Sequence, residues 1–281
     1  MKLIHITDTH LVRPGQELLG LDPESRLRAC IADINTNHPD ADLCVITGDL
    51  THWGQKEAFT LLRQCLSTLA IPYRLILGNH DDRAMFLATF PEARVDADGF
   101  VQSVLPADKG HLLFLDTVMH GTHAGWYCQA RQVWLRQHLQ RLAPPLYLFM
   151  HHAPFPVGMP LADQIGLVQA DEFRAVVEPF RDKIRHLFFG HLHRPINGSW
   201  LGIPFSTIRA TSHQSALDFR PDATNLIGSH EPPAYAIALI RDDAVVIHVH
   251  DFLDSSPRFK TGGVAWEDWQ GEDSGELVLA D

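Results

Sequence analysis

Side chains that bind metal ions follow five apolar runs of this sequence, at the point where each run ends. They lie in the segments Asp8-Thr9-His10, Gly48-Asp49, Gly78-Asn79-His80-Asp81, His151-His152 and Gly190-His191-Leu192-His193. Imidazole, carboxylate and amide ligands without thiolates suit Fe, Mn, Zn or Co better than a structural zinc site, which is rich in cysteine. The residue types therefore predict ions of this group at the ends of the runs.

The runs themselves are short and rich in leucine or β-branched residues, as buried strands are. They and a sixth such run span residues 2–7, 42–47, 73–77, 111–116, 146–150 and 186–189. Between them, apolar residues recur at helical spacing within 27–34, 59–69, 135–142 and 173–180. This alternation predicts an α/β fold with much parallel pairing and helices on both sides. After residue 195 helical patterns become rare, and we expect more antiparallel strands.

The carboxyl ends of parallel strands lie along one edge of a sheet, where ligands bind. We therefore expect the five strand ends to form a single site, with cations that hold the polar groups together. A glycine directly before several of these residues allows the backbone to turn sharply. His191 and His193 point the same way in extended backbone, so each can bind one of two neighbouring ions.

Composition and charge narrow the class of protein. The 281 residues are 45% hydrophobic and 20% charged, which is typical of a globular protein. A net charge of −11 without a basic run argues against nucleic-acid binding, which needs clustered cations. No signal peptide or membrane-spanning run is found, and Cys30, Cys44, Cys65 and Cys128 form no CxxC pair. We expect a cytoplasmic protein with free cysteines that binds neither nucleic acid nor membrane.

The ordered set of motifs from Asp8 to His193 resembles that of the calcineurin-like binuclear metallophosphoesterases. Four segments are similar to the cyclic-nucleotide and glycerophosphodiester phosphodiesterase branch: GNHDD (78–82), HGTHAGWY (120–127), FMHHAP (149–154) and ATSHQ (210–214). The resemblance implies a four-layer α/β/β/α sandwich of two mixed sheets. We expect the catalytic domain to span residues 1–255 and an acidic C-terminal tail to span 256–281.

The resemblance also implies a role for each residue of the set. One ion would be bound by Asp8, His10 and His193, and the other by Asn79, His151 and His191. Asp49 would bridge the ions, about 3.5–4 Å apart, and be essential for hydrolysis. A neutral Asn79 would keep the site receptive to an anionic substrate. His80 would contact the substrate phosphate or protonate the leaving alkoxide, and His213 would line the pocket.

The other histidines are expected to serve in different ways. His5 should be buried with a hydrogen bond, and His152 should at most support the ligand beside it. His52 and His123 are candidates for the edge of the substrate cleft. The residues expected to be solvated or at a rim are His38, His138, His186, His230 and His248.

By this resemblance the protein is a hydrolase of small phosphodiesters, in which a metal-bound hydroxide attacks the phosphorus. Metal-bound water loses its proton near pH ~7, so no protein nucleophile is needed, and neither GxSxG nor GxxxxGK[ST] occurs. A phosphomonoesterase on the same two metal ions is the alternative, although no arginine cluster for a dianion lies near the motifs. A nuclease does not suit the acidic composition, and a scaffold without activity would be expected to lack ligands. Terminal or inserted segments of this branch often form oligomers, so the resemblance also allows a homo-oligomer.

Overall fold

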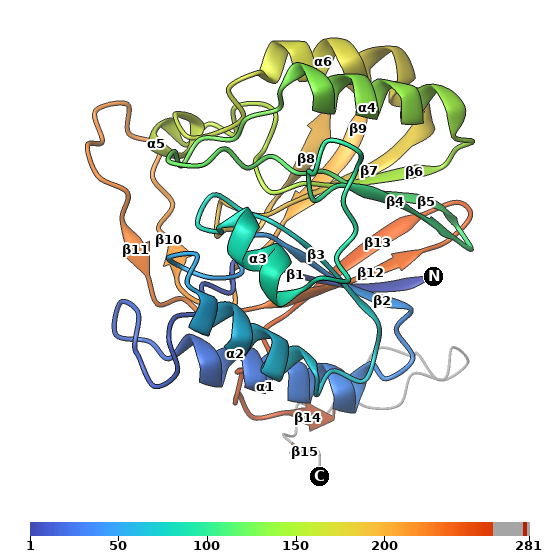
Figure 1. The fold of residues 1–281 in the computed structure, drawn as a ribbon. Coiled ribbons are helices and arrows are strands. Elements are labelled where there is room, and N and C mark those ends of the chain that lie inside the picture. The colour runs from blue at the N-terminus through green and yellow to red at the C-terminus, as the bar shows by residue number, and fades with distance from the viewer. Residues whose placement is uncertain (261–277, 280–281) are drawn as a thin grey trace, which may run out of the picture.

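Two β-sheets pack face to face in the computed structural model, which describes residues 1–260 and 278–279 (Figure 1). The five-stranded sheet has the order β13-β12-β1-β2-β3 and the six-stranded sheet the order β4-β5-β6-β7-β9-β8. The strands of the first are β1 (Lys2–Ile6), β2 (Leu43–Thr47), β3 (Tyr73–Ile76), β12 (Tyr235–Ile240) and β13 (Val245–His250). Those of the second are β4 (Ser103–Ala107), β5 (Gly110–Phe114), β6 (Leu146–Phe149), β7 (Ile184–Phe189), β8 (Ile196–Trp200) and β9 (Ile203–Thr207).

Helices cover the outer face of each sheet (Figure 1). The five-stranded sheet is covered by α1 (Pro23–Asn37), α2 (Lys56–Leu66) and α3 (Arg83–Thr89). The six-stranded sheet is covered by α4 (Gln129–Arg141) and α6 (Ala170–Val177), with the short α5 (Pro160–Asp163) and a 3-10 turn (Glu178–Lys183) beside them. The expected four-layer α/β/β/α architecture is therefore confirmed.

Three apolar layers hold the molecule together, one between the sheets and one under each set of helices. Alternate residues of β1 serve two of them: Leu3 faces the other sheet, and Ile4 and Ile6 face the helices. Because both faces of the central strands are buried, these strands are apolar throughout, which is why they are recognisable in the sequence. The helices begin at local signals, as at Asp22, whose carboxylate accepts from the Ser25 amide (3.1 Å) before Pro23.

Most of the expected elements are present. The expectation that all five strand ends lie along the edge of one sheet is wrong. β1, β2 and β3 belong to one sheet and β6 and β7 to the other, so the polar residues after them come from the edges of two sheets. Both sheets are mixed: β12 and β13 are antiparallel as expected, whereas β9 also pairs parallel with β7. The sequence did not indicate β4, β8 or α3.

His186 contradicts its prediction, because it is buried in β7 rather than solvated. β7 begins at Ile184, two residues before the apolar run, so His186 lies inside the strand. Its Nε2 lies 3.0 Å from the Ser206 hydroxyl of β9, and its ring packs against Phe188. All four cysteines are free, as expected, and Cys128 is the one that is not fully buried.

Two small strand pairs complete the described residues. β10 (Gln214–Ser215) and β11 (Gly228–Ser229) close a long loop, and β14 (Phe259–Lys260) pairs with β15 (Val278–Leu279). Most of the acidic tail expected over 256–281 lies outside the described residues. Within them, every helix is too short or too polar to cross a membrane.

Candidate metal centre

The carboxyl ends of strands from both sheets bring the predicted ligand residues together. The residues come after β1, β2, β3, β6 and β7: Asp8, His10, Asp49, Asn79, His151, His191 and His193. Asn79 and His191 are half-buried and the other five are buried. The site is thus formed by loops that two rigid sheets hold in place.

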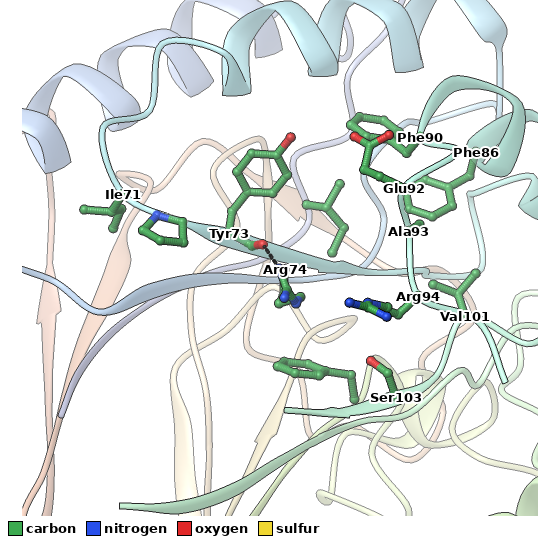
Figure 2. Close-up of a pocket in the computed structure, with 13 residues that line it drawn as sticks. Ile71, Tyr73, Arg74, Phe86, Phe90, Glu92, Ala93, Arg94, Val101 and Ser103 are labelled. Atoms are coloured by element: carbon green, nitrogen blue, oxygen red, sulfur yellow. Dashed lines mark hydrogen bonds between the residues drawn. The ribbon is translucent and has the colours of Figure 1, made fainter. Parts of the chain in front are cut away.

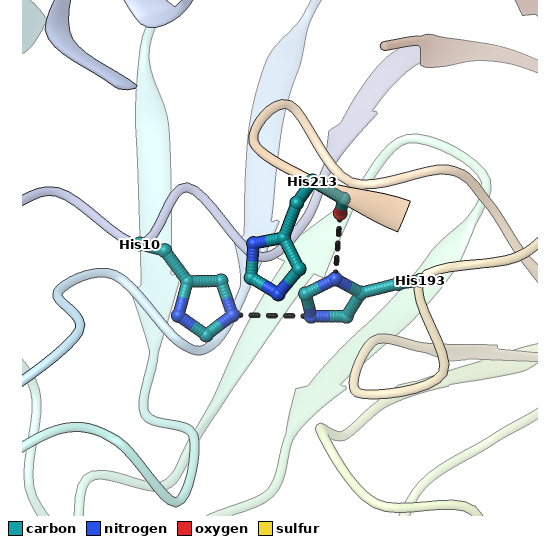
Figure 3. A group of neighbouring side chains, drawn as sticks. All are labelled: His10, His193 and His213. Atoms are coloured by element: carbon teal, nitrogen blue, oxygen red, sulfur yellow. Dashed lines mark hydrogen bonds between the residues drawn. The ribbon is translucent and has the colours of Figure 1, made fainter. Parts of the chain in front are cut away.

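A first cluster consists of Asp8, His10, Asp49 and His193, whose ligand atoms all lie within 4.8 Å of one another. His10 Nε2 lies 3.1 Å from His193 Nε2 and 3.5 Å from Asp49 Oδ2, and His193 Nε2 lies 3.2 Å from Asp8 Oδ1. Figure 3 shows the His10 and His193 rings pointing toward each other, with His213 beside them. These atoms enclose a point that a single cation can reach.

A second cluster shares Asp49 with the first. His151 Nε2 lies 3.4 Å from Asp49 Oδ1 and 3.1 Å from Asn79 Oδ1. The His191 ring centroid is 5.1 Å from that of His151, and His191 Nε2 is buried without a hydrogen-bond partner among the described residues. Because Asp49 turns one oxygen to each cluster, its position suits a carboxylate that bridges two ions.

The donor set fits metal cations, because two histidines are held in the tautomer that a ligand needs. Nδ1 of His151 donates to the Thr47 carbonyl and Nδ1 of His193 to the His213 carbonyl, both at 2.7 Å. A carbonyl oxygen only accepts, so each Nε2 is the nitrogen directed into a cluster, where it can carry either a proton or a metal ion. There His151 Nε2 lies 3.1 Å from Asn79 Oδ1, so a proton or a metal ion on this nitrogen would lie beside the amide oxygen.

Burial and charge both act on the ionisable groups of the clusters. Burial would raise the pKa of Asp49, but the charge of His151 and a hydrogen bond to it hold the pKa well below its usual value. Burial would lower the pKa of His151, yet Asp49 raises it to about 9. Burial and repulsion from His151 lower the pKa of His191 to about 3, because they outweigh the attraction of Asp49 and Asp8. The carboxylates therefore stay ionised, and the site attracts positive charge.

A chain of buried hydrogen bonds supports Asp8 from behind, and no motif in the sequence indicated it. The Thr7 hydroxyl donates to Asp8 Oδ2 (2.6 Å), and the Thr47 hydroxyl donates to Thr7 (2.8 Å). The Thr47 proton is thus in use, so His5 Nε2 donates to the Thr47 oxygen at 2.8 Å. His5 is buried with a hydrogen bond, as expected, and the chain ends at a candidate ligand.

Asp81 is a second residue without a predicted role, although it belongs to the motif after β3. Its carboxylate accepts from the backbone amides of Gly78 (2.9 Å), Leu50 (3.0 Å) and Thr51 (2.9 Å). It therefore ties the loop of Asp49 to the loop of Asn79. Burial and the nearby charge of Asp49 raise the pKa of Asp81 to about 7.

Of the three glycines directly before candidate ligands, Gly48 has the positive φ (92°) of the sharp turn that we expected, whereas Gly78 and Gly190 allow close approach. Neither Gly78 nor Gly190 has a positive φ. A Cβ on Gly190 would lie 2.3 Å from Thr7 Oγ1, and one on Gly78 would lie 2.2 Å from Asp49 Oδ1. Only a residue without a side chain fits at these two positions. Five candidate ligands also have positive φ angles: Asp8 (53°), His10 (42°), Asp49 (46°), His191 (68°) and His193 (49°).

Three further histidines, His80, His52 and His123, lie beside the clusters. His80 donates from Nδ1 to the His52 carbonyl (2.8 Å), its amide donates to Asp49 Oδ1 (2.9 Å), and its ring centroid lies 4.8 Å from that of His10. His52 stacks on His80 at 4.7 Å, and His123 lies 5.0 Å from His80. His80 Nε2 is thus the nitrogen left for a substrate.

His213 and His152 lie beside the ligands. The His213 ring centroid is 4.6 Å from that of His193. His152 is buried, and its two nitrogens contact the Thr117 hydroxyl (2.7 Å) and the His123 carbonyl (3.2 Å). Both His152 nitrogens are in hydrogen bonds, and one of them lies within 4.8 Å of ligand atoms of His151 and His191. A supporting role for His152 stays a prediction.

Sequence comparisons place these residues in a known context. Residues 1–195 match the family model described as calcineurin-like phosphoesterase. A probable cyclic nucleotide phosphodiesterase of Rhodopseudomonas palustris is 42% identical over 264 residues, covering 92% of this chain and 95% of its own. The glycerophosphodiester phosphodiesterase GpdQ of Enterobacter lignolyticus is 31% identical, over 76% of this chain and 78% of its own. The 3',5'-cyclic adenosine monophosphate phosphodiesterase CpdA of Escherichia coli is 26% identical, over 91% of both.

Solved structures show the same fold at much lower identity. A purple acid phosphatase from yellow lupin seeds has a TM-score of 0.66 at 12% identity, covering 91% of this chain and 52% of its own. The anchor of the inner membrane complex of Plasmodium has a TM-score of 0.61 at 10% identity, over 91% of this chain and 86% of its own.

Proposed function

Because the chain belongs to the calcineurin-like phosphoesterase family, we propose that it hydrolyses small phosphodiesters of the cyclic-nucleotide or glycerophosphodiester type with two bound metal ions. The observation that carries this proposal is the convergence of the predicted ligands into two clusters that share Asp49. The printed names of similar proteins, which include phosphodiesterases of both types, support the substrate class.

In this proposal Asp8, His10 and His193 hold one ion, Asn79, His151 and His191 hold the other, and Asp49 bridges them. Fe, Mn, Zn and Co all suit these ligands. Such ions supply an acidic water and polarise the phosphoryl oxygens.

The chain's own groups bind and orient the substrate. His80 is fixed by its two hydrogen bonds, to the His52 carbonyl and to Asp49. Since its Nδ1 proton is already donated, the imidazolium form offers the Nε2 proton to the phosphate or to the leaving alkoxide. Asn79 adds no negative charge to the site, which favours an anionic substrate. His213 lines the side of the first cluster.

The test compares a diester with its monoester on one preparation. Chelator-stripped protein is titrated with Mn²⁺ while hydrolysis of bis(p-nitrophenyl) phosphate and p-nitrophenyl phosphate is followed. We expect activity to return at two ions per chain, with the diester faster. Faster hydrolysis of the monoester would make the protein a phosphomonoesterase that uses the same site. No hydrolysis with Mn, Fe, Zn or Co would favour a scaffold without catalytic activity.

The Asp49→Ala variant isolates the shared ligand. It should abolish hydrolysis and leave the circular dichroism spectrum unchanged, whereas Asp40→Ala, which removes an exposed ion pair with Lys2, should keep full activity. Unchanged hydrolysis in Asp49→Ala would refute the bridging role.

We also propose that the catalytic domain spans residues 1–255 and works in the cytoplasm. β13 ends at His250, just before the proposed boundary, and the four free cysteines suit a reducing compartment. Assembly into a homo-oligomer stays a prediction, which light scattering on the purified protein would test.

A further inference from the structure

A second cavity lies apart from the candidate metal centre, between β3 and β4, the edge strands of the two sheets (Figure 2). Its volume is about 420 Å³, within the range of about 300–1,000 Å³ that is common for small-molecule sites. It is lined by residues 71–75 of β3 and the segment before it, by Phe86 and Phe90, by residues 92–94, and by Val101, Ser103 and Phe114. No residue of the candidate metal centre lines it.

Aromatic side chains form much of the cavity wall. The rings of Phe86 and Phe90 stack at 5.1 Å with 24° between their planes, and both residues are buried. Phe114 and Val101 complete a surface that water hydrates poorly. These four residues are at most 3% exposed, so the apolar surface that an occupant can reach comes mainly from the half-buried Tyr73 and Leu75. The Tyr73 ring favours a flat apolar group, because aromatic groups pack best in stacked or edge-to-face geometry.

Two arginines face the same cavity without a counter-ion. Figure 2 shows the Arg74 and Arg94 side chains reaching into the space between β3 and Ser103. Among the described residues neither arginine pairs with a carboxylate, and the hydrogen bond of Arg74 goes to the Tyr73 carbonyl (3.0 Å). The one acid of the lining, Glu92, is bound by Arg63 at 2.8 Å. In a chain of net charge −11, two neighbouring guanidinium groups thus remain available to an anion.

We propose that this cavity is a binding site for a small organic anion with a flat apolar body and one acidic group, such as a carboxylate or sulfonate. The body packs at the edge of β3 beside Tyr73 and Leu75, and the acidic group binds Arg74 and Arg94. An inorganic anion would use only the guanidinium groups, and a neutral aromatic compound would use only the apolar lining. The site is independent of the metal ions and of the proposed hydrolysis.

The experiment uses two fluorescent probes that differ in charge. 1-Anilinonaphthalene-8-sulfonate carries the anion, and N-phenyl-1-naphthylamine has the same rings without it. Both are titrated onto the full-length protein after chelator treatment, so that no metal ion competes for the sulfonate. We expect one sulfonate probe per chain, bound at least tenfold more tightly than the neutral probe.

Variants locate the charge and the cavity. The Arg74→Gln/Arg94→Gln variant should bind the sulfonate probe at least tenfold more weakly and bind the neutral probe with unchanged affinity. Arg136→Gln/Arg141→Gln, a matched pair of exposed arginines on α4, should change neither. Ala93→Trp should fill the cavity and abolish both, and thermal unfolding of each variant checks that it is folded.

Three results would overturn the proposal. The first is equal affinity of the two probes for the unmodified protein, and the second is unchanged sulfonate binding in the folded Arg74→Gln/Arg94→Gln variant. The third comes from displacement by naphthalene-2-carboxylate and by laurate. Tighter binding of laurate would mean that a fatty chain, not a flat body, occupies the cavity.

Discussion

At the scale of single residues, the candidate metal centre depends on groups that stand behind the ligands. Backbone carbonyls of Thr47 and His213 fix the ring nitrogens of His151 and His193. Hydroxyl groups fix Asp8 in the same way. Such partners orient a ligand before the metal arrives, so their removal should weaken metal binding without touching the metal.

Thr7→Val tests this support, because it removes the hydroxyl that donates to Asp8 and keeps the side-chain shape. We expect metal affinity to fall by about tenfold, measured by calorimetric titration of Zn²⁺ into chelator-stripped protein. Thr207→Val is the matched control, since that buried threonine hydroxyl has no hydrogen-bond partner among the described residues. Equal Zn²⁺ affinities of the two variants would mean that the hydrogen bonds from Thr7 and Thr47 do not orient Asp8.

Gly190→Ala tests the close approach of the backbone to the site. Its Cβ would lie 2.3 Å from Thr7 Oγ1 and 2.6 Å from the Thr47 carbonyl. We expect a loss of about 1–3 kcal/mol in the free energy of unfolding, measured in urea on metal-free protein, and weaker metal binding. Gly166→Ala, whose Cβ would meet nothing closer than 3.4 Å, should be tolerated. A Gly190→Ala variant as stable as Gly166→Ala would contradict the steric argument.

Residue types in motifs were predictable, and supporting groups were not. Asp8, His10 and their partners carry a recognisable spacing, which the family resemblance turns into ligand sets. Thr7 and Thr47 are ordinary strand residues, and only the register of β1 against β2 makes their hydroxyls meet. The prediction for His186 was wrong for a related reason. Local sequence does not reveal whether a histidine lies just inside or just outside the first residue of a strand.

At the scale of elements, buried strands and amphipathic helices were predictable because their apolar patterns are continuous. The elements that were missed are edges or short: β4 contains Pro106 and lies at the edge of its sheet, and β8 reads INGSW with three exposed residues in the middle. Such strands bury one face at most. The division of the parallel strands between two sheets depends on long-range pairing, which no local pattern encodes.

Asp116, at the end of β5, joins two helices that belong to different layers. It binds Arg83 of α3 with two bonds of 2.9 Å, lies 3.4 Å from Arg131 of α4, and also accepts from the amides of Val101 and Val118 (2.9 Å each). Both Asp116 and Arg131 are buried. This cluster therefore couples the helices on opposite sides of the molecule.

Asp116→Ala should lower the free energy of unfolding by about 3–5 kcal/mol, because it leaves buried Arg131 without its charge partner. Urea unfolding measures the change. Asp182→Ala, which removes a surface ion pair of 3.8 Å with Arg181, should cost less than about 1 kcal/mol. Similar losses in the two variants would show that the cluster contributes no more than a surface pair.

At the scale of the whole molecule, buried neutral histidines set the acid limit of stability. Burial lowers the pKa of His186 to about 4 and that of His5 to about 3. The unfolded chain binds these protons at its ordinary pKa of about 6.5, whereas the folded chain does not. The folded state is therefore stable above pH 6.5 and loses stability as the pH falls toward 4.

His186→Gln should remove part of this acid sensitivity. Between pH 7.5 and pH 5.0, the unmodified protein should lose about 2 kcal/mol more than the variant, as follows from a pKa of 6.5 unfolded and about 4 folded. Urea unfolding at both pH values gives the difference, and His248→Gln, at an exposed position of β13, should follow the unmodified protein. Parallel losses in all three proteins would rule out His186 as a contributor.

The distance along the chain between facing ligands decides when the site can form during synthesis. His10 and His193 lie 3.1 Å apart but are separated by 183 residues. Asp8 and His10 leave the ribosome early, and the strand that completes one side of β1 is β12, which is made almost last. A nascent chain therefore carries only scattered ligands, and a metal ion bound before β7 emerges would lack His191 and His193. If two ions bind as proposed, we expect them to bind only after β7 has emerged and the ligands from both sheets have met.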